Sequence, residues 1–155
     1  MSEPLGYFLT WSTYGTWLPG DGRGWIEHCE GWKAPDPIRK IRAEELMKES
    51  PCLLRETHRL AVEAQITETC EHRGWQLHAV NCRSNHIHVV VEAPEATCRK
   101  VRIDLKGWAT RCLKQKVDGT RENWWAERGY TCLLKTQTCL DAAIIYTLEA
   151  QDYKF

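Results

Sequence analysis

The fold is decided by residues 75–93, which run Trp-Gln-Leu-His-Ala-Val-Asn-Cys-Arg-Ser-Asn-His-Ile-His-Val-Val-Val-Glu-Ala. Residues 75–82 alternate in polarity, and residues 86–93 are rich in β-branched side chains, so both segments are predicted to be strands. The residues between them, Arg83-Ser84-Asn85, have the polar character of a turn. The stretch therefore predicts a β-hairpin near the middle of the chain.

Further elements are predicted on both sides of this hairpin. We expect a strand at 5–12, a helix at 53–73 that ends at Gly74, a helix at 95–116, a strand at 129–136 and a final helix at 138–150. This order predicts an α+β fold of the ferredoxin-like (RRM-like) split βαβ type. It has one four-stranded antiparallel sheet, helices on one face, and an added C-terminal helix that carries Tyr146.

Residues 13–52 are predicted to be a long loop inserted into one domain that spans residues 1–155. Residues 14–25 hold four glycines and one proline, which indicates several tight turns. Residues 26–52 have no clear periodicity, apart from a short helix near 41–49. A loop of this length in a compact domain is usually functional or mobile.

The composition is that of a water-soluble globular protein, with 43% hydrophobic and 27% charged residues in a chain of 155. No apolar run approaches the roughly 20 residues of a membrane span, and the N-terminus has no signal-peptide pattern. We therefore expect a cytoplasmic protein.

The cysteines form no CxxC pair, so we predict reduced, mostly buried thiols at positions 29, 52, 70, 82, 98, 112, 132 and 139.

The net charge is zero, but the basic residues are concentrated in one predicted helix. Such a helix either contacts nucleic-acid phosphates or simply presents a solvated face. On the first reading, the DNA contacts come from Arg99, Lys100, Arg102, Lys106, Arg111 and Lys114. Aromatic side chains are candidates for stacking on unpaired bases, with a role as core or loop anchors as the alternative; they are Trp17, Trp25, Trp32, Trp124 and Trp125.

His86 and His88 are two residues apart on a predicted strand, so their side chains point to the same face of the sheet. Two neutral imidazoles at that spacing can hold one divalent cation. Ile87, between them, is expected to point into the core. The alternative is that the two histidines are ordinary polar residues on the wet face of the sheet.

Tyr146 lies on the final helix, and Glu149 lies three residues later, so helical geometry puts them on one face. A tyrosine beside a metal-binding carboxylate can act as a nucleophile, because a nearby cation stabilises its phenolate. The alternative is an ordinary half-buried tyrosine. Tyr14, Tyr130 and Tyr153 are rival nucleophiles, and Tyr130, on the last predicted strand, is the strongest of them.

These residues resemble the IS200-like single-tyrosine transposases, and in particular the relatives associated with repeated extragenic palindromes. The resemblance rests on Asn85-His-Ile-His-Val-Val-Val91 and on the C-terminal helix that bears Tyr146. The opening Thr10-Trp-Ser-Thr-Tyr-Gly-Thr-Trp-Leu-Pro-Gly20 is similar to the start of one group in this family. So is Trp125-Ala-Glu-Arg-Gly129, which precedes the last predicted strand.

The resemblance implies a DNA transposase and single-strand endonuclease that binds DNA hairpins. Such enzymes cut one strand through a 5′-phosphotyrosine link and rejoin strands by the reverse step. By position, Tyr146 would be the nucleophile, and His86 and His88 would hold Mg²⁺ or Mn²⁺. The family commonly has an amide ligand four residues after the tyrosine, where this chain has Ala150. The neighbours Glu149 and Gln151 are the candidates for that role, and helical geometry favours Glu149.

Other functions are compatible with the same residues. The change at Ala150 is also what a catalytically decayed, domesticated hairpin-binding protein would carry. An RNA-binding module of the same fold class is a third reading. A zinc hydrolase that uses His86, His88 and Glu149 is a fourth. The resemblance allows either a monomer or a homodimer.

Overall fold

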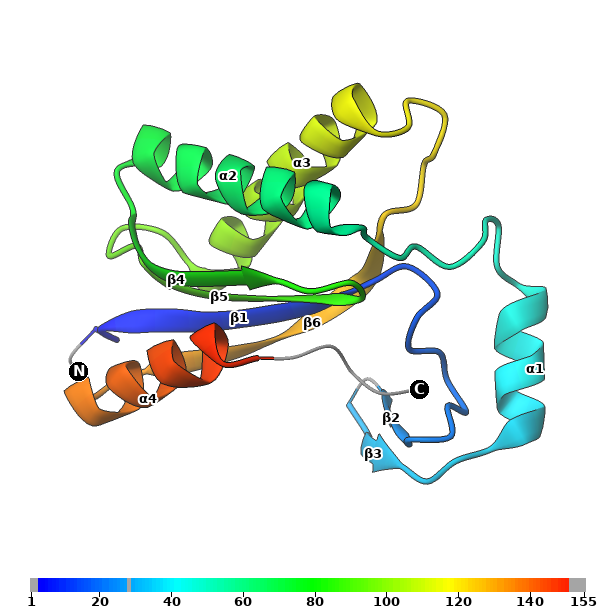
Figure 1. The fold of residues 1–155 in the computed structure, drawn as a ribbon. Coiled ribbons are helices and arrows are strands. Elements are labelled where there is room, and N and C mark those ends of the chain that lie inside the picture. The colour runs from blue at the N-terminus through cyan, green and yellow to red at the C-terminus, as the bar shows by residue number, and fades with distance from the viewer. Residues whose placement is uncertain (1–2, 28, 151–155) are drawn as a thin grey trace.

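The computed structural model describes residues 3–27 and 29–150. Its main sheet has four strands, β1 (Gly6–Thr13), β4 (Gln76–Cys82), β5 (His86–Glu92) and β6 (Trp125–Leu134). The strands lie in the order β4-β5-β1-β6, and all neighbours are antiparallel (Figure 1). The predicted hairpin and first strand are confirmed. The last strand begins earlier than predicted, because Trp125 already pairs with Thr13 after a bulge in the ladder.

Two helices, α2 (Glu56–Arg73) and α3 (Cys98–Lys116), pack on one face of the sheet (Figure 1). Helix α2 ends at Gly74 as predicted, in the left-handed conformation with φ of 73° that favours glycine. Helix α3 begins later than predicted, because the Thr97 side chain accepts a hydrogen bond from the Lys100 backbone N–H and so caps the helix. Trp108, predicted in its apolar stripe, is exposed instead, with the Arg111 guanidinium 4.8 Å from its ring centre.

The C-terminal helix, α4 (Gln137–Leu148), lies on the opposite face of the sheet (Figure 1). The prediction of helices on one face therefore holds for α2 and α3, while α4 forms a third layer. Within α4 only Leu140 and Thr147 are buried. Leu140 packs in a small cluster with Ala79, Val90 and Leu134.

Residues 14–55 contain more regular structure than the sequence predicted. Strands β2 (Trp25–Glu27) and β3 (Gly31–Lys33) form an antiparallel hairpin, and helix α1 covers Pro37–Glu45. The helix starts where Asp36 caps the Arg39 backbone N–H and proline occupies the first turn. The helix predicted near 41–49 is thus present but begins and ends earlier.

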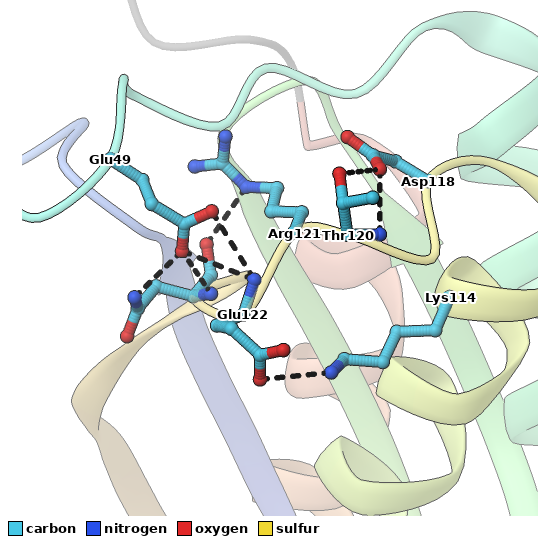
Figure 2. A network of polar contacts seen from close by, with 7 residues as sticks. Glu49, Lys114, Asp118, Thr120, Arg121 and Glu122 are labelled. Carbon is cyan, nitrogen blue, oxygen red and sulfur yellow. Dashed lines mark hydrogen bonds and ion pairs between the residues drawn. The ribbon is translucent and has the colours of Figure 1, made fainter.

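This inserted segment is fastened to the sheet at its two ends. The Thr13 N–H donates to the Asn85 carbonyl over 2.9 Å, and the Leu54 N–H donates to the Ser84 carbonyl over 2.8 Å. Near its end, the Glu49 carboxylate accepts hydrogen bonds from the backbone N–H groups of Glu122 and Asn123. Figure 2 shows this network, in which Glu122 also pairs with Lys114 of α3 over 3.0 Å. The segment is therefore tied both to the turn before His86 and to the loop before β6.

All eight cysteines are free thiols. Cys52, Cys70, Cys82 and Cys112 are buried, whereas Cys29 and Cys139 are exposed, so the prediction of mostly buried thiols holds for half of them. Burial raises the pKa of Cys70 to about 11, which keeps that thiol protonated.

Within residues 3–27 and 29–150, no helix is long and apolar enough to cross a membrane.

Candidate active site

The centre of the candidate site is the pair His86 and His88 on β5. Ile87, Val89 and Val91 point into the core under α2 and α3, so the two histidines point to the face that carries α4. Their ring centres are 4.6 Å apart, and their exposed fractions are 1% and 2%. The pairing predicted from their spacing is confirmed, but the alternative of a wet face is wrong, because neighbouring residues cover both rings.

The His86 ring is oriented by the residue before it. Its Nδ1 lies 2.8 Å from Oδ1 of Asn85, which is itself 1% exposed. Because a carboxamide oxygen only accepts hydrogen bonds, Nδ1 carries the proton and Nε2 carries the lone pair. The Asn85 carbonyl is held in turn by the hydroxyls of Thr13 and Thr16, at 3.3 and 3.4 Å. Metal-binding histidines commonly use their second nitrogen in this way.

The His88 ring is stacked on Phe8 of β1, with ring centres 5.7 Å apart and an interplanar angle of 22°. Burial lowers the pKa of His88 to about 4, because a charged imidazole would lose its hydration there. The imidazole is therefore neutral near pH 7, which is the form that binds metals. Its Nδ1 is buried and has no hydrogen-bond partner in the described part of the chain, which is unusual for a buried polar atom.

Tyr146 is next to this pair. Its ring centre lies 5.5 Å from that of His88 and 5.9 Å from that of Phe8, in edge-to-face geometry in both cases. It is 59% exposed, so a substrate can reach it from solvent. The structure thus gathers His86, His88 and Tyr146 from two elements that are far apart in the sequence.

The rival tyrosines differ in placement. Tyr130 on β6 is 60% exposed and contacts Phe8 edge-on at 6.4 Å between ring centres. Tyr130 pairs with Thr10 of β1, and Thr10 pairs on its other side with His88 of β5. Strand β1 therefore lies between Tyr130 and the histidines. Tyr14 is engaged elsewhere, since its hydroxyl accepts from the Lys48 N–H at 2.9 Å. Tyr153 lies outside the described residues.

Of the two predicted third ligands, Glu149 forms no three-donor group with the histidine pair. Glu149 is the exposed residue that caps the C-terminus of α4. Within residues 3–27 and 29–150, no three His, Cys, Asp or Glu side chains lie close enough together to hold a metal ion. Gln151 lies outside the described residues. The two imidazoles, with the buried unbonded Nδ1 of His88, fit one divalent cation as a two-residue donor set, and a third protein ligand stays a prediction.

Asn81 of β4 is a residue of this site that the sequence did not reveal. It is opposite His88 in the β4–β5 register. Its Nδ2 donates to the carbonyls of Thr147 and Ala150 at the end of α4, over 2.9 and 3.1 Å. The alternating pattern of residues 75–82 gave no sign of these partners, which lie more than 60 residues later in the chain.

The predicted DNA-binding helix is on the other side of the sheet from this site. Helix α3 packs with α2 against the core, whereas Tyr146 and the two histidines lie on the α4 face (Figure 1). Any DNA contact by α3 would therefore be made away from the tyrosine, by parts of the DNA that extend around the edge of the sheet.

Most of the predicted DNA-binding side chains also have partners within the protein. Lys100 pairs with Asp104 at 2.9 Å, Arg102 donates to the Thr131 hydroxyl, and Lys114 pairs with Glu122.

Lys106 donates to the Ala126 carbonyl over 2.9 Å, and burial lowers its pKa to about 8. Arg99 and Arg111 are exposed. The six residues remain predicted DNA contacts, and the two exposed arginines are the most accessible of them.

The predicted base-stacking tryptophans divide in a similar way. Trp25 and Trp124 are buried, and the Trp125 indole donates to the Thr110 hydroxyl over 2.9 Å. These three tryptophans anchor the fold, which is the alternative role considered for them from the sequence. Trp17 and Trp32 are exposed on the inserted segment, so they remain candidates for stacking on bases.

The family model for "Transposase IS200 like" matches residues 46–146, which is more than half of the chain, and the match ends at Tyr146. This chain belongs to the IS200-like transposase family. Membership supports a DNA transposase role, as the motif around His86 and His88 predicted. The matched region contains the histidine pair and the tyrosine, and it begins after most of the inserted segment.

Solved structures show the same fold at low sequence identity. A "putative transposase" from Deinococcus radiodurans R1 has a TM-score of 0.56 and 15% identity, over 96% of this chain and 92% of that one. A REP-associated tyrosine transposase bound to a REP hairpin has a TM-score of 0.56 and 12% identity, over 94% of this chain and 66% of that one. No curated protein sequence matches this IS200-like transposase.

Proposed function

We propose that this IS200-like transposase cuts and rejoins single-stranded DNA through a covalent link to Tyr146. The observation that carries the proposal is the edge-to-face contact of the Tyr146 and His88 rings at 5.5 Å, with His86 beside them. It supports the predicted roles, because an exposed phenol next to two metal-binding imidazoles is the arrangement that a tyrosine nucleophile needs. The βαββαβ order of β1, α2, β4, β5, α3 and β6 supports the ferredoxin-like split βαβ fold.

Cleavage would proceed by attack of the Tyr146 oxygen on a phosphorus atom of the DNA backbone. A bond forms between the Tyr146 oxygen and phosphorus, and the bond from phosphorus to the 3′ oxygen breaks. The phenol loses its proton, and the departing oxygen gains one to become a free 3′-hydroxyl. Attack by another 3′-hydroxyl on the phosphotyrosine reverses these changes and joins two strands. One phosphodiester is exchanged for another, so no further energy source is required.

The protein residues have distinct tasks in this scheme. His86, held by Asn85, and His88, kept neutral by its burial, would hold Mg²⁺ or Mn²⁺ through their ring nitrogens. Such a cation would polarise a phosphate oxygen and stabilise phenolate when bound. Glu149 and Gln151 stay the two proposed candidates for the third ligand, and Glu149 would have to move toward the histidine pair to fill that role. The exposure of Tyr146 admits a DNA strand to the site.

The proposed partner is single-stranded DNA next to a hairpin. The motifs of the sequence imply a hairpin ligand, and the REP-associated neighbour with the same fold is bound to one. Trp17 and Trp32 would stack on unpaired bases, while Arg99 and Arg111 would meet phosphates at the far side of the sheet. Both a monomer and a homodimer are compatible with this proposal.

The test is a denaturing-gel assay for a covalent adduct. Hairpin-flanked single strands from the surroundings of the gene, labelled at the 5′ or 3′ end, are incubated with protein and Mg²⁺ or Mn²⁺. We expect a metal-dependent adduct on the downstream piece, and loss of at least about 1,000-fold in adduct with Tyr146→Phe, as is usual for removal of a nucleophile. Tyr130→Phe makes the same change on the neighbouring exposed tyrosine and is expected to leave the adduct in place.

A second candidate function is favoured by one observation. The chain has Ala150 where the family has an amide ligand, and no three-donor metal group is found in the described residues. A catalytically decayed hairpin-binding protein would have these features. Tight hairpin binding without an adduct under any metal would support this candidate and overturn the proposed cleavage.

A further inference from the structure

We propose that Asn81 is a positioning residue that holds the C-terminal end of α4, and with it Tyr146, against the histidine pair. The inference rests on the proposed function, because it explains how the proposed nucleophile is kept beside its site. Asn81 does not act on the DNA itself. It acts on the main chain that follows Tyr146.

The contacts of Asn81 link the two halves of the site. On one side it is the cross-strand neighbour of His88, in a ladder that fixes its position on the sheet. On the other side, the two N–H groups of its Nδ2 donate to the carbonyls of Thr147 and Ala150. One side chain therefore connects the strand pair that holds the histidines to the residue directly after Tyr146.

Helix α4 packs on the sheet in its C-terminal half through Ala143, Ile144 and Thr147, and an attachment next to Tyr146 adds to this packing at the helix end. At its start, Leu140 is buried in the small cluster with Ala79 and Val90. In its second half Thr147 is fully buried, but Ile145, Tyr146 and Leu148 are each more than half exposed. The last carbonyls of a helix also have no partner within the helix. Asn81 donates to the carbonyl of Thr147 in the last turn and to that of Ala150 just beyond the helix, and so ties the end of α4 to the sheet.

The consequence is that Asn81 controls how often Tyr146 is in place. The 5.5 Å contact between the Tyr146 and His88 rings requires the end of α4 to lie on β4 and β5. Without the two hydrogen bonds, the helix end would leave the sheet for part of the time, and the tyrosine with it. The attack step would slow, whereas DNA affinity would not change, because no DNA contact is lost.

The test uses Asn81→Asp, which keeps the size of the side chain but removes both donors. The new carboxylate would face two carbonyl oxygens at the negative end of a helix. It would repel these carbonyls, whereas the Asn81 amide donates hydrogen bonds to them. Asn81→Ala is the second variant, since it removes the donors without adding charge. Gln76→Glu is the matched control, because it makes the same amide-to-carboxylate change at an exposed position on the same strand.

Three quantities are measured on the full chain. Hydrogen exchange of amides in the second half of α4 is expected to accelerate by about 10- to 100-fold in both Asn81 variants, the effect of losing two hydrogen bonds. The NMR cross-peak between the Tyr146 and His88 rings is expected to weaken by the fraction of time that the helix end spends away from the sheet. The rate of adduct formation is expected to fall by the same fraction, with an unchanged Kd for hairpin DNA. Gln76→Glu is expected to leave all three as in the wild type.

Unchanged exchange in α4 together with an intact ring cross-peak in both Asn81 variants would overturn the proposal. So would a loss of adduct that is explained entirely by weaker DNA binding. The exchange and NMR measurements need neither DNA nor metal. If they respond as expected while the wild type forms no adduct, the attachment of α4 is supported and the proposed cleavage function is the part that fails.

Discussion

The two faces of the main sheet differ in what they bury. On the face covered by α2 and α3, eighteen buried residues form one cluster, with Leu105, Ile87 and Val89 fully enclosed. On the face covered by α4, the buried apolar cluster has four members among the described residues. That face also carries His86, His88 and Asn81. One face therefore holds most of the buried core and the other holds the proposed site, in keeping with the tendency of functional elements to be the less stable ones.

Leu105→Ala tests the stability of the α2–α3 face and has the largest expected effect. Leu105 is fully buried, so its truncation removes contacts and leaves a cavity, at a cost of about 2–5 kcal/mol in the free energy of unfolding. Urea denaturation measures this change. The adduct rate per folded molecule is expected to stay within about twofold, because Leu105 lies in the core on the opposite side of the sheet from the site. A larger loss of activity in the folded protein would contradict the division between the faces.

Leu140→Ala is the matched substitution on the α4 face. Its cost is expected near the low end of the same range, about 2 kcal/mol or less, because Leu140 belongs to the smaller cluster. The adduct rate per folded molecule is expected to fall by about tenfold or more, since the start of α4 loses its anchor and Tyr146 its position. A stability loss equal to that of Leu105→Ala, with normal activity, would show that the two faces are alike.

The pH dependence of stability gives the smallest and most local effect. The pKa of His88 falls from 6.5 to about 4 in the folded protein because of burial, so the unfolded chain binds more protons in that window. We expect the contribution of His88 to be constant above pH 6.5, to fall as pH drops toward 4, and to level off below. His88→Gln, compared with the wild type by urea denaturation between pH 4 and 7.5, is expected to flatten this slope. An unchanged slope would contradict this account, because it would mean that His88 has the same pKa in the folded and unfolded states.

Much of the fold could be predicted because its signals are local. The alternation along β5 predicted which side chains share a face with His86, and Gly74 marked the end of α2. The element boundaries were less accurate where a cap decides them, as at Thr97 and Asp36. The β2–β3 hairpin was missed, because its strands have three residues each and are too short to show a period.

The site could be predicted only in part, because burial and long-range contacts depend on the third dimension. The spacing of His86 and His88 was sufficient to predict the pair, and the family resemblance added Tyr146. Nothing in the sequence indicated that α4 would cover the histidines, that Asn81 would bond to the end of that helix, or that Lys106 would be partly buried. The same limit explains why the sequence did not distinguish the buried Trp25 from the exposed Trp32.

The central claim is that Tyr146, held on the α4 face beside the histidine pair, is the residue that becomes joined to DNA. Mapping the covalent adduct by tryptic digestion and tandem mass spectrometry tests it most directly. Cleavage after Arg128 and Lys135 separates Tyr130 from Tyr146, and peptide fragmentation separates Tyr146 from Tyr153. We predict a nucleotide-phosphate modification on Tyr146. A modification on Tyr130 would contradict the claim and move the nucleophile from α4 to the sheet.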